Sequence, residues 1–207
     1  MYNIAITGVG GGVGQSILKS LSGLGYNLVA LDGETLAAGL YAAPTSYLIP
    51  YASDPNYIDR LLEICKLEKI DLLFPGLDAE LMILSLNSDK FKSIGTTVVV
   101  SDPSVIKISD DKQETYDRLT EAGSTVPYTT SLTGFDVEKA NFPLIIKQQV
   151  GGARSKNIFL AKTIDEWNNI ITKIQNMDDY IVMDYIEGEE YTCGTVNLGS
   201  ECKGVIV

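Results

Sequence analysis

A glycine-rich turn between a strand and a helix is the feature of this 207-residue chain that most constrains its fold. Residues 2–7 are strand-like and run directly into a glycine-rich segment that extends from Gly8 to Gly14. Apolar residues then recur at helical spacing as far as Leu21. A strand, a glycine turn and a helix in this order predict the first unit of a parallel sheet.

The same alternation continues through the first half of the chain. We expect further strands at residues 27–32, 47–50, 72–75 and 97–100, and helices at residues 55–68 and 79–86. Asp54 is the expected N-cap of the first of these helices, with Pro55 at its first position. The pattern predicts the α/β class, with helices on both faces of a parallel sheet. We place this doubly wound domain at residues 1–108.

The second half has a different rhythm, typical of an antiparallel α+β domain at residues 109–207. We expect helices at residues 111–122 and 164–174, strands at residues 126–130, 142–147, 158–161 and 180–184, and a hairpin formed by residues 190–197 and 202–207. Leu198, Gly199 and Ser200 are the expected turn of that hairpin.

Residues 142–161 join an apolar strand to a basic loop that contains glycines. Glycine lets the backbone approach a ligand closely and offer N–H donors, while basic side chains add positive charge. The candidate ligand-binding residues of this segment are Lys147, Gly151, Gly152, Arg154, Ser155 and Lys156. They would suit a polyphosphate, and the alternative is an ordinary hairpin with a solvated basic turn.

The composition excludes several classes of function. A net charge of -11 and a pI near 4.4 argue against nucleic acid or a membrane as a partner, since both require broad positive potential. The absence of histidine excludes a Ser/His/Asp triad and histidine ligation of a metal. The three cysteines form no CxxC pair, and no apolar run is long enough to span a bilayer. We expect a cytoplasmic protein.

The first glycine turn also fits the pattern TGxxxGxG, which resembles short-chain dehydrogenases. Asp32 would then bind a ribose at the end of the second strand. None of the eleven tyrosines has a lysine four positions later, so the YxxxK proton relay of those enzymes is missing. An NAD(P)-binding oxidoreductase therefore stays an alternative, as does a turn whose glycines only allow close strand-to-helix packing. No Gly-Lys pair is present, so there is no Walker A loop.

Taken together, the order and spacing of the motifs resemble the ATP-grasp superfamily, most closely the large subunit of carbamoyl phosphate synthetase and related carboxylate-amine ligases. GVGGGVGQS resembles the turn of a Rossmann-like pre-ATP-grasp domain, and SDDKQETYDRLTEAGSTVP resembles the entry to the ATP-grasp domain. FPLIIKQQVGGARSKNI resembles the phosphate loop, and YIVMDYIEGEEYTCGTV resembles the adenine hinge. The resemblance covers essentially the whole chain and implies an incomplete, N-terminal part of an ATP-grasp domain.

The resemblance implies ATP as the ligand and assigns residues to it. Lys112 and Lys147 would contact phosphate together with the loop residues named above, and Glu190 would accept from the ribose hydroxyls. The segment Asp184, Tyr185 and Ile186 would contact adenine. Substrate binding is assigned to the glycine turn at Gly10, Gly11 and Gly12.

The implied reaction is the ATP-dependent formation of an acyl phosphate, or of carboxyphosphate from bicarbonate, and its transfer to an amine or ammonia. Mg²⁺ is the implied second cofactor, with ligands expected in the half of the ATP-grasp domain that would follow Val207. We therefore assign no catalytic or metal-binding residue to this chain and expect it to be inactive alone. The implied partners are ATP and a small carboxylate or bicarbonate, and a homo-oligomer is left open.

Two departures from the family pattern bear on these assignments. The loop VGGARSKN is poorer in glycine and serine than the family loop, although Asn157 tolerates a positive φ. Asp184 stands where a glutamate is usual, which shortens its reach toward adenine. A noncatalytic nucleotide-binding or effector-binding module is the remaining alternative.

Overall fold

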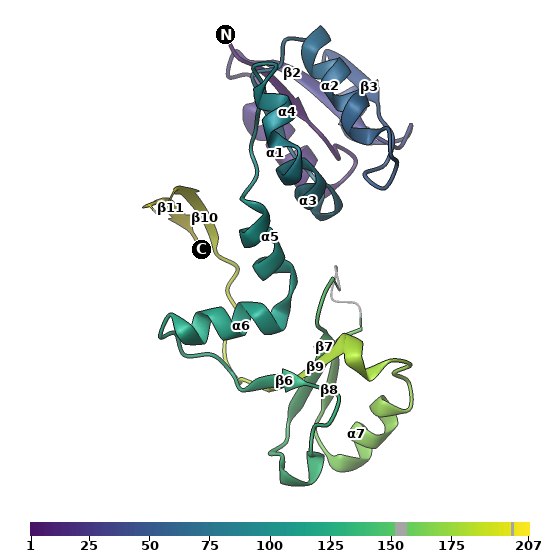
Figure 1. Ribbon diagram of the computed structural model, residues 1–207, viewed down its shortest axis with the longest axis vertical. Coiled ribbons are helices and arrows are strands. Elements are labelled where there is room, and N and C mark those ends of the chain that lie inside the picture. The colour runs from purple at the N-terminus through teal and green to yellow at the C-terminus, as the bar shows by residue number, and fades with distance from the viewer. Residues whose placement is uncertain (152–156, 200) are drawn as a thin grey trace. The chain divides into compact units, whose positions relative to one another are not determined.

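The computed structural model describes residues 1–151, 157–199 and 201–207 and divides into two compact units, Met1–Asp110 and Asp111–Val207 (Figure 1). Each unit is built around its own sheet and its own apolar core. Gly152, Arg154, Ser155 and Lys156 of the predicted loop lie outside the described residues.

Unit 1 contains a five-stranded parallel sheet with the strand order β3-β2-β1-β4-β5. The strands are β1 (Asn3–Ile6), β2 (Asn27–Asp32), β3 (Thr45–Leu48), β4 (Leu72–Phe74) and β5 (Thr97–Val98). The helices are α1 (Gly12–Leu21), α2 (Tyr57–Leu67), α3 (Asp78–Leu86), α4 (Ser88–Lys92) and α5 (Pro103–Asp110). The predicted α/β class with a parallel sheet is confirmed.

Apolar clusters cover both faces of this sheet, because successive residues of a strand point to opposite sides. On β1, Ala5 packs into a cluster with Leu61 of α2, whereas Ile4 and Ile6 pack into a second cluster with Leu18 of α1. The sheet is therefore doubly wound, as expected from buried parallel strands.

The strand order reverses between β1 and β4, and glycines allow the chain to close tightly there. A Cβ on Gly76 would lie 2.1 Å from the carbonyl oxygen of Thr7, and a Cβ on Gly14 would lie 2.4 Å from that of Gly8. Gly8 also has a φ of +61°. The glycine turn thus serves the close contact of β1, α1 and β4.

Unit 2 contains a four-stranded antiparallel sheet with the order β6-β9-β7-β8 and a separate two-stranded hairpin. Its helices are α6 (Lys112–Glu121) and α7 (Ile164–Ile171), and its strands are β6 (Thr129–Ser131), β7 (Leu144–Gln148), β8 (Phe159–Ala161), β9 (Tyr180–Asp184), β10 (Gly194–Leu198) and β11 (Glu201–Ile206). The expected antiparallel α+β organisation and the hairpin are both present. Every residue of β10 and β11 is exposed, and Ser200 of the expected turn lies outside the described residues.

One face of the four-stranded sheet packs on α7. Leu144 and Ile146 of β7 and Val182 of β9 form an apolar cluster with Trp167 and Ile170 of α7. Phe135 extends this cluster, with its ring centroid 5.4 Å from that of Trp167. The alternate residues of β7 and β9 face the other side of the sheet.

Several expected element ends differ from those observed. Helix α2 begins at Tyr57 with Asn56 as its N-cap residue, two positions later than expected. Asp54 instead accepts from the backbone N–H of Asn56 at 2.8 Å, which makes a turn before the helix. Helix α5, whose first residue is Pro103, was not expected from the sequence. Proline suits that position because it has no N–H to satisfy.

Candidate functional site

Strand β7 places Lys147 on the sheet face opposite α7. Lys147 is three residues beyond Leu144, so the two side chains point to opposite sides of the sheet. Its Nζ donates to the hydroxyl of Tyr116 at 3.1 Å and lies 5.1 Å from the centroid of that ring. In the described part of the chain, no carboxylate lies within ion-pair distance of this ammonium. Lys147 is thus a half-buried cation held by a neutral partner.

The start of α6 is attached to the end of the β7 segment, which consists of β7 and residues 149–151 that follow it. Asp111 caps α6 by accepting from the backbone N–H groups of Gln113 and Glu114, and both its oxygens also accept from Gln149 Nε2, at 3.1 and 3.0 Å. Lys112 Nζ donates to the carbonyl oxygen of Gly151 at 2.7 Å. Two predicted phosphate contacts, Lys112 and Gly151, are therefore brought together.

Lys112 and Tyr116 are one turn apart on the same side of α6. Because Tyr116 contacts Lys147, the side of α6 that carries Lys112 also faces Lys147. Gly151 has a φ of +73°, which favours glycine, and a Cβ there would meet no atom within 4 Å. At the other end of the loop, Asn157 has a φ of 58°, a positive value that asparagine was expected to tolerate.

The predicted adenine segment follows β9. Asp184 is the last residue of the strand, and its backbone N–H donates to the carbonyl oxygen of Tyr128 at 3.0 Å. The N–H of Tyr185 donates to the carbonyl oxygen of Pro143 at 3.2 Å, and Ile186 is 65% exposed. Glu190 is exposed beyond them.

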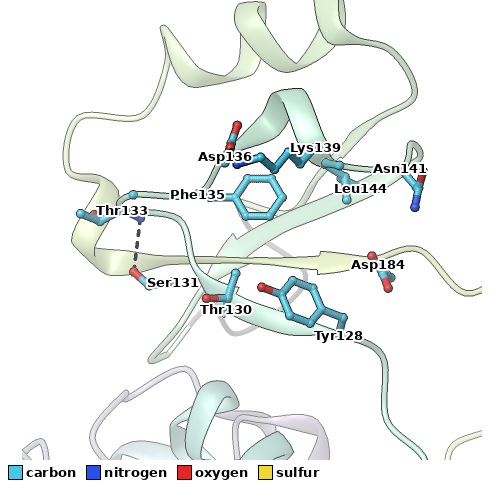
Figure 2. A pocket seen from close by; sticks show the side chains of 12 residues that line it. Tyr128, Thr130, Ser131, Thr133, Phe135, Asp136, Lys139, Asn141, Leu144 and Asp184 are labelled. Atoms are coloured by element: carbon cyan, nitrogen blue, oxygen red, sulfur yellow. Dashed lines mark hydrogen bonds and ion pairs between the residues drawn. The ribbon is translucent and has the colours of Figure 1, made fainter.

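The Asp184 carboxylate lies on a different face from Lys147. Asp184 pairs with Leu144, so its side chain shares the face of the sheet that packs on α7. Figure 2 shows it beside a cavity of about 550 Å³ that is also lined by Tyr128, Phe135 and Lys139. The structure therefore does not bring the Asp184 carboxylate and the Lys147 ammonium onto one face of the sheet.

In unit 1, Asp32 supports the glycine turn directly. Its Oδ2 accepts from the backbone N–H of Gly10 at 2.7 Å, and its Oδ1 accepts from that of Glu34 at 2.9 Å. Asp32 is only 8% exposed. Both carboxylate oxygens of Asp32 therefore already accept a backbone N–H group, and a ribose diol would have to share them. Gly11 is the N-cap residue of α1, and Gly12, its first residue, is exposed.

Two family models divide the chain between them. Residues 4–99 match the PylC-like N-terminal domain, and residues 109–207 match the ATP-grasp domain. The chain belongs to the ATP-grasp superfamily. No curated protein matches it in sequence.

Solved structures share the fold of this ATP-grasp chain at low identity. N5-carboxyaminoimidazole ribonucleotide synthetase from Thermotoga maritima is 20% identical with a TM-score of 0.64, over 90% of this chain and 46% of the other. L-amino acid ligase from Bacillus licheniformis is 15% identical with a TM-score of 0.69, over 98% and 48% of the respective chains.

A third similar structure is the biotin carboxylase domain dimer of Hydrogenobacter thermophilus 2-oxoglutarate carboxylase, in complex with MgADP, ADP and bicarbonate. It is 18% identical with a TM-score of 0.64, over 90% of this chain and 45% of the other. The present ATP-grasp chain thus spans about half the length of the structures it matches.

Sequence reasoning missed a buried acid in the first unit of this ATP-grasp chain. Glu80 is 3% exposed and accepts from the Thr7 hydroxyl, whose oxygen accepts in turn from the N–H of Gly76 at 3.2 Å. Burial raises the pKa of Glu80, and burial together with the Glu80 charge raises the pKa of Tyr57. The available signal was a glutamate near the start of a largely apolar helix, DAELMILSL.

Two searches of the described residues gave negative results. No helix among them is long and apolar enough to cross a membrane. Over residues 1–151, 157–199 and 201–207, no three acidic or cysteine side chains are grouped to hold a metal ion.

Proposed function

We propose that the Lys147 face of the β6-β9-β7-β8 sheet binds the phosphates of ATP. The observation that carries this proposal is the position of the Lys147 ammonium, which lies on the face away from α7 with a neutral hydroxyl as its partner. A half-buried cation of this kind gains from an anionic ligand. The ATP-grasp domain match over residues 109–207 supports the choice of a nucleotide.

The neighbouring residues fit the same ligand. Lys112 lies at the first turn of α6, and Gly151 opens the loop that continues from β7. We assign the loop residues Gly152, Arg154, Ser155 and Lys156 to the phosphates as a further part of this proposal. Cationic side chains and backbone N–H groups in one loop are a recurrent arrangement for phosphate binding.

The adenine and ribose would extend toward the end of β9. We assign the adenine edge to the backbone of Asp184, Tyr185 and Ile186, because the Asp184 carboxylate faces the opposite side of the sheet. Glu190, which is exposed, would accept from the ribose diol, since one carboxylate can take two hydrogen bonds.

For a protein with the length of the matched structures, we propose an ATP-dependent carboxylate-amine ligase. The γ-phosphoryl group would pass to a carboxylate or bicarbonate oxygen with release of ADP. An amine or ammonia nitrogen would then attack the acyl carbon, and phosphate would leave. The matched structures support this class because they include a ligase of amino acids and a carboxylase domain bound to MgADP and bicarbonate. A reaction like that of carbamoyl phosphate synthetase is one form of this proposal.

Mg²⁺, when bound with ATP, neutralises charge on the phosphates during such a transfer. The described residues offer Lys112 and Lys147 to the phosphates and no grouped carboxylates for the metal. We therefore propose no metal ligand within this chain and expect nucleotide binding without turnover.

The glycine turn of unit 1 is the proposed site for the substrate. Gly10, Gly11 and Gly12 lie at the N-terminus of α1, where the helix dipole favours an anionic group such as a carboxylate. The N–H groups of Gly10 and Gly11 already donate to Asp32 and to the carbonyl oxygen of Gly8, so we assign the direct contact to the N–H of Gly12. The turn favours the NAD(P)-binding alternative less, because Asp32 is already bonded to Gly10 and Glu34.

Calorimetric titration of ADP and ATP into the 207-residue protein tests the nucleotide proposal. A charge-assisted hydrogen bond contributes roughly 1.5–3 kcal/mol, so Lys147→Ala is expected to weaken binding by roughly 10- to 100-fold. Lys173→Ala, an exposed lysine after α7, is the matched control and should leave binding unchanged. Equal affinity of the Lys147→Ala protein for ADP, or binding of NADH in competition with ADP, would overturn the proposal.

A further inference from the structure

Tyr116 joins three elements of unit 2 through one side chain. It extends from α6, accepts a hydrogen bond from Lys147 of β7 at 3.1 Å, and donates to Met183 Sδ of β9 at 3.9 Å. Met183 pairs with Ile145, so both point to the same side of the sheet as Lys147. The tyrosine therefore lies over the sheet face that carries the proposed phosphate site.

The contact restrains the ammonium in two ways. The Tyr116 hydroxyl oxygen accepts from one of the three N–H groups of the Lys147 ammonium. The face of the Tyr116 ring, whose centroid lies 5.1 Å from Lys147 Nζ, also attracts the positive charge. A lysine side chain is otherwise a flexible stem with many rotamers. Holding it in one place before a ligand arrives reduces the entropy that binding must overcome.

The neutrality of the partner matters as much as its position. A carboxylate at this place would neutralise Lys147 and would compete with phosphate for the ammonium. A phenol orients the ammonium and leaves its charge available to an anion.

The position of Tyr116 is itself fixed at the start of its helix. Asp111 caps α6 and bonds Gln149, while Lys112 bonds Gly151. Tyr116 lies one turn later on the same side of the helix. The end of the β7 segment thus determines where the tyrosine lies relative to Lys147.

We propose that Tyr116 is a positioning residue that holds the Lys147 ammonium on the nucleotide-binding face of the sheet. The proposal rests on the proposed function of that face. Tyr116 acts through Lys147 and need not touch the nucleotide.

A double-mutant cycle with ADP as the titrant tests the proposal. Tyr116→Phe keeps the ring and loses the acceptor, so we expect ADP binding to weaken by about 3- to 10-fold; Tyr116→Leu loses both and should weaken it further. In the Lys147→Ala background the same two substitutions should have no further effect, which a general loss of structure would not reproduce. Tyr26→Phe in unit 1 makes the same chemical change on the surface as a control.

An NMR measurement on the free protein supplies an independent readout. The ε-methylene signal of Lys147, assigned by its loss in Lys147→Ala, should show an upfield ring-current shift that Tyr116→Phe retains and Tyr116→Leu removes. Circular dichroism establishes that each variant is folded.

The outcomes separate the two proposals. A strong effect of Lys147→Ala with no effect of either Tyr116 substitution overturns the role of Tyr116 and leaves the nucleotide site standing. Equal effects of the Tyr116 substitutions with and without Lys147 also overturn it. Failure of the unsubstituted protein to bind ADP overturns the nucleotide site, and the role of Tyr116 falls with it.

Discussion

Gln149 Nε2 donates to both carboxylate oxygens of Asp111, at 3.1 and 3.0 Å, across 38 residues of sequence. The same carboxylate caps α6 through the N–H groups of Gln113 and Glu114. One side chain therefore fixes both the beginning of a helix and the end of the β7 segment, which carries the proposed phosphate-binding residues.

Asp111→Ala is expected to destabilise the protein by roughly 1–3 kcal/mol, because it removes the helix cap and leaves the Gln149 amide without its partner. Urea denaturation followed by far-UV circular dichroism measures the change. Asp111→Asn is the matched control, since asparagine caps helices about as well and its carbonyl oxygen can accept from Gln149. A loss of stability in Asp111→Asn as large as in Asp111→Ala would contradict this account of the cap.

Gly76→Ala is expected to destabilise unit 1 by roughly 1–3 kcal/mol or more, since overpacked sites are costly and the added Cβ meets a backbone atom. The contact is with the carbonyl oxygen of Thr7, at 2.1 Å, and neither segment can move without disturbing the ends of β1 and β4. Gly12→Ala is the control: a Cβ there meets nothing within 4 Å, so the change should be neutral or stabilising. Thermal unfolding of the two variants compares them, and equal melting temperatures would refute the close-contact argument.

The buried Glu80 is expected to make the stability of the protein depend on pH, with a definite sign. Its pKa in the folded protein is raised above the ordinary 4.5 by burial, so the folded state keeps a proton that the unfolded state releases. The free energy of unfolding contributed by this group therefore falls as the pH rises from about 4.5 toward the raised pKa.

Glu80→Gln should remove this part of the pH dependence while its amide oxygen still accepts from the Thr7 hydroxyl. Urea denaturation at a series of pH values between about 4 and 8 should show a flatter profile and a stability at pH 7 no lower than that of the unsubstituted protein. An unchanged pH profile would show that Glu80 is not the group responsible. Asp78→Asn, on the exposed first turn of the same helix, controls for a change of charge alone.

Much of the fold followed from local pattern. Strand β2 at Asn27–Asp32 and strand β9 at Tyr180–Asp184 have the bounds that the sequence predicts, because each is a short apolar run that ends in an aspartate. Lys147 was expected on an apolar strand that leads into a glycine loop, and it lies there. These features depend only on residues close together in the chain.

The features that escaped prediction depend on contacts between distant residues. The face on which Asp184 lies is set by its pairing with Leu144, 40 residues earlier, and a shift of one residue would reverse it. The contact between Tyr116 and Lys147 and the burial of Glu80 beneath Thr7 likewise join segments with no local signal for each other. Local pattern therefore located Lys147 and Asp184 on their strands and left the orientation of both side chains open.

The alternation along β7 limits how this segment can vary in length. Deletion of one residue near the start of β7 would turn Lys147 into the apolar layer around Trp167 and would turn Ile146 out to the face proposed to bind nucleotide. Substitutions that keep the alternation leave both faces intact. We therefore expect insertions and deletions among natural variants to be confined to the connections between strands, while β7 itself accumulates only point changes.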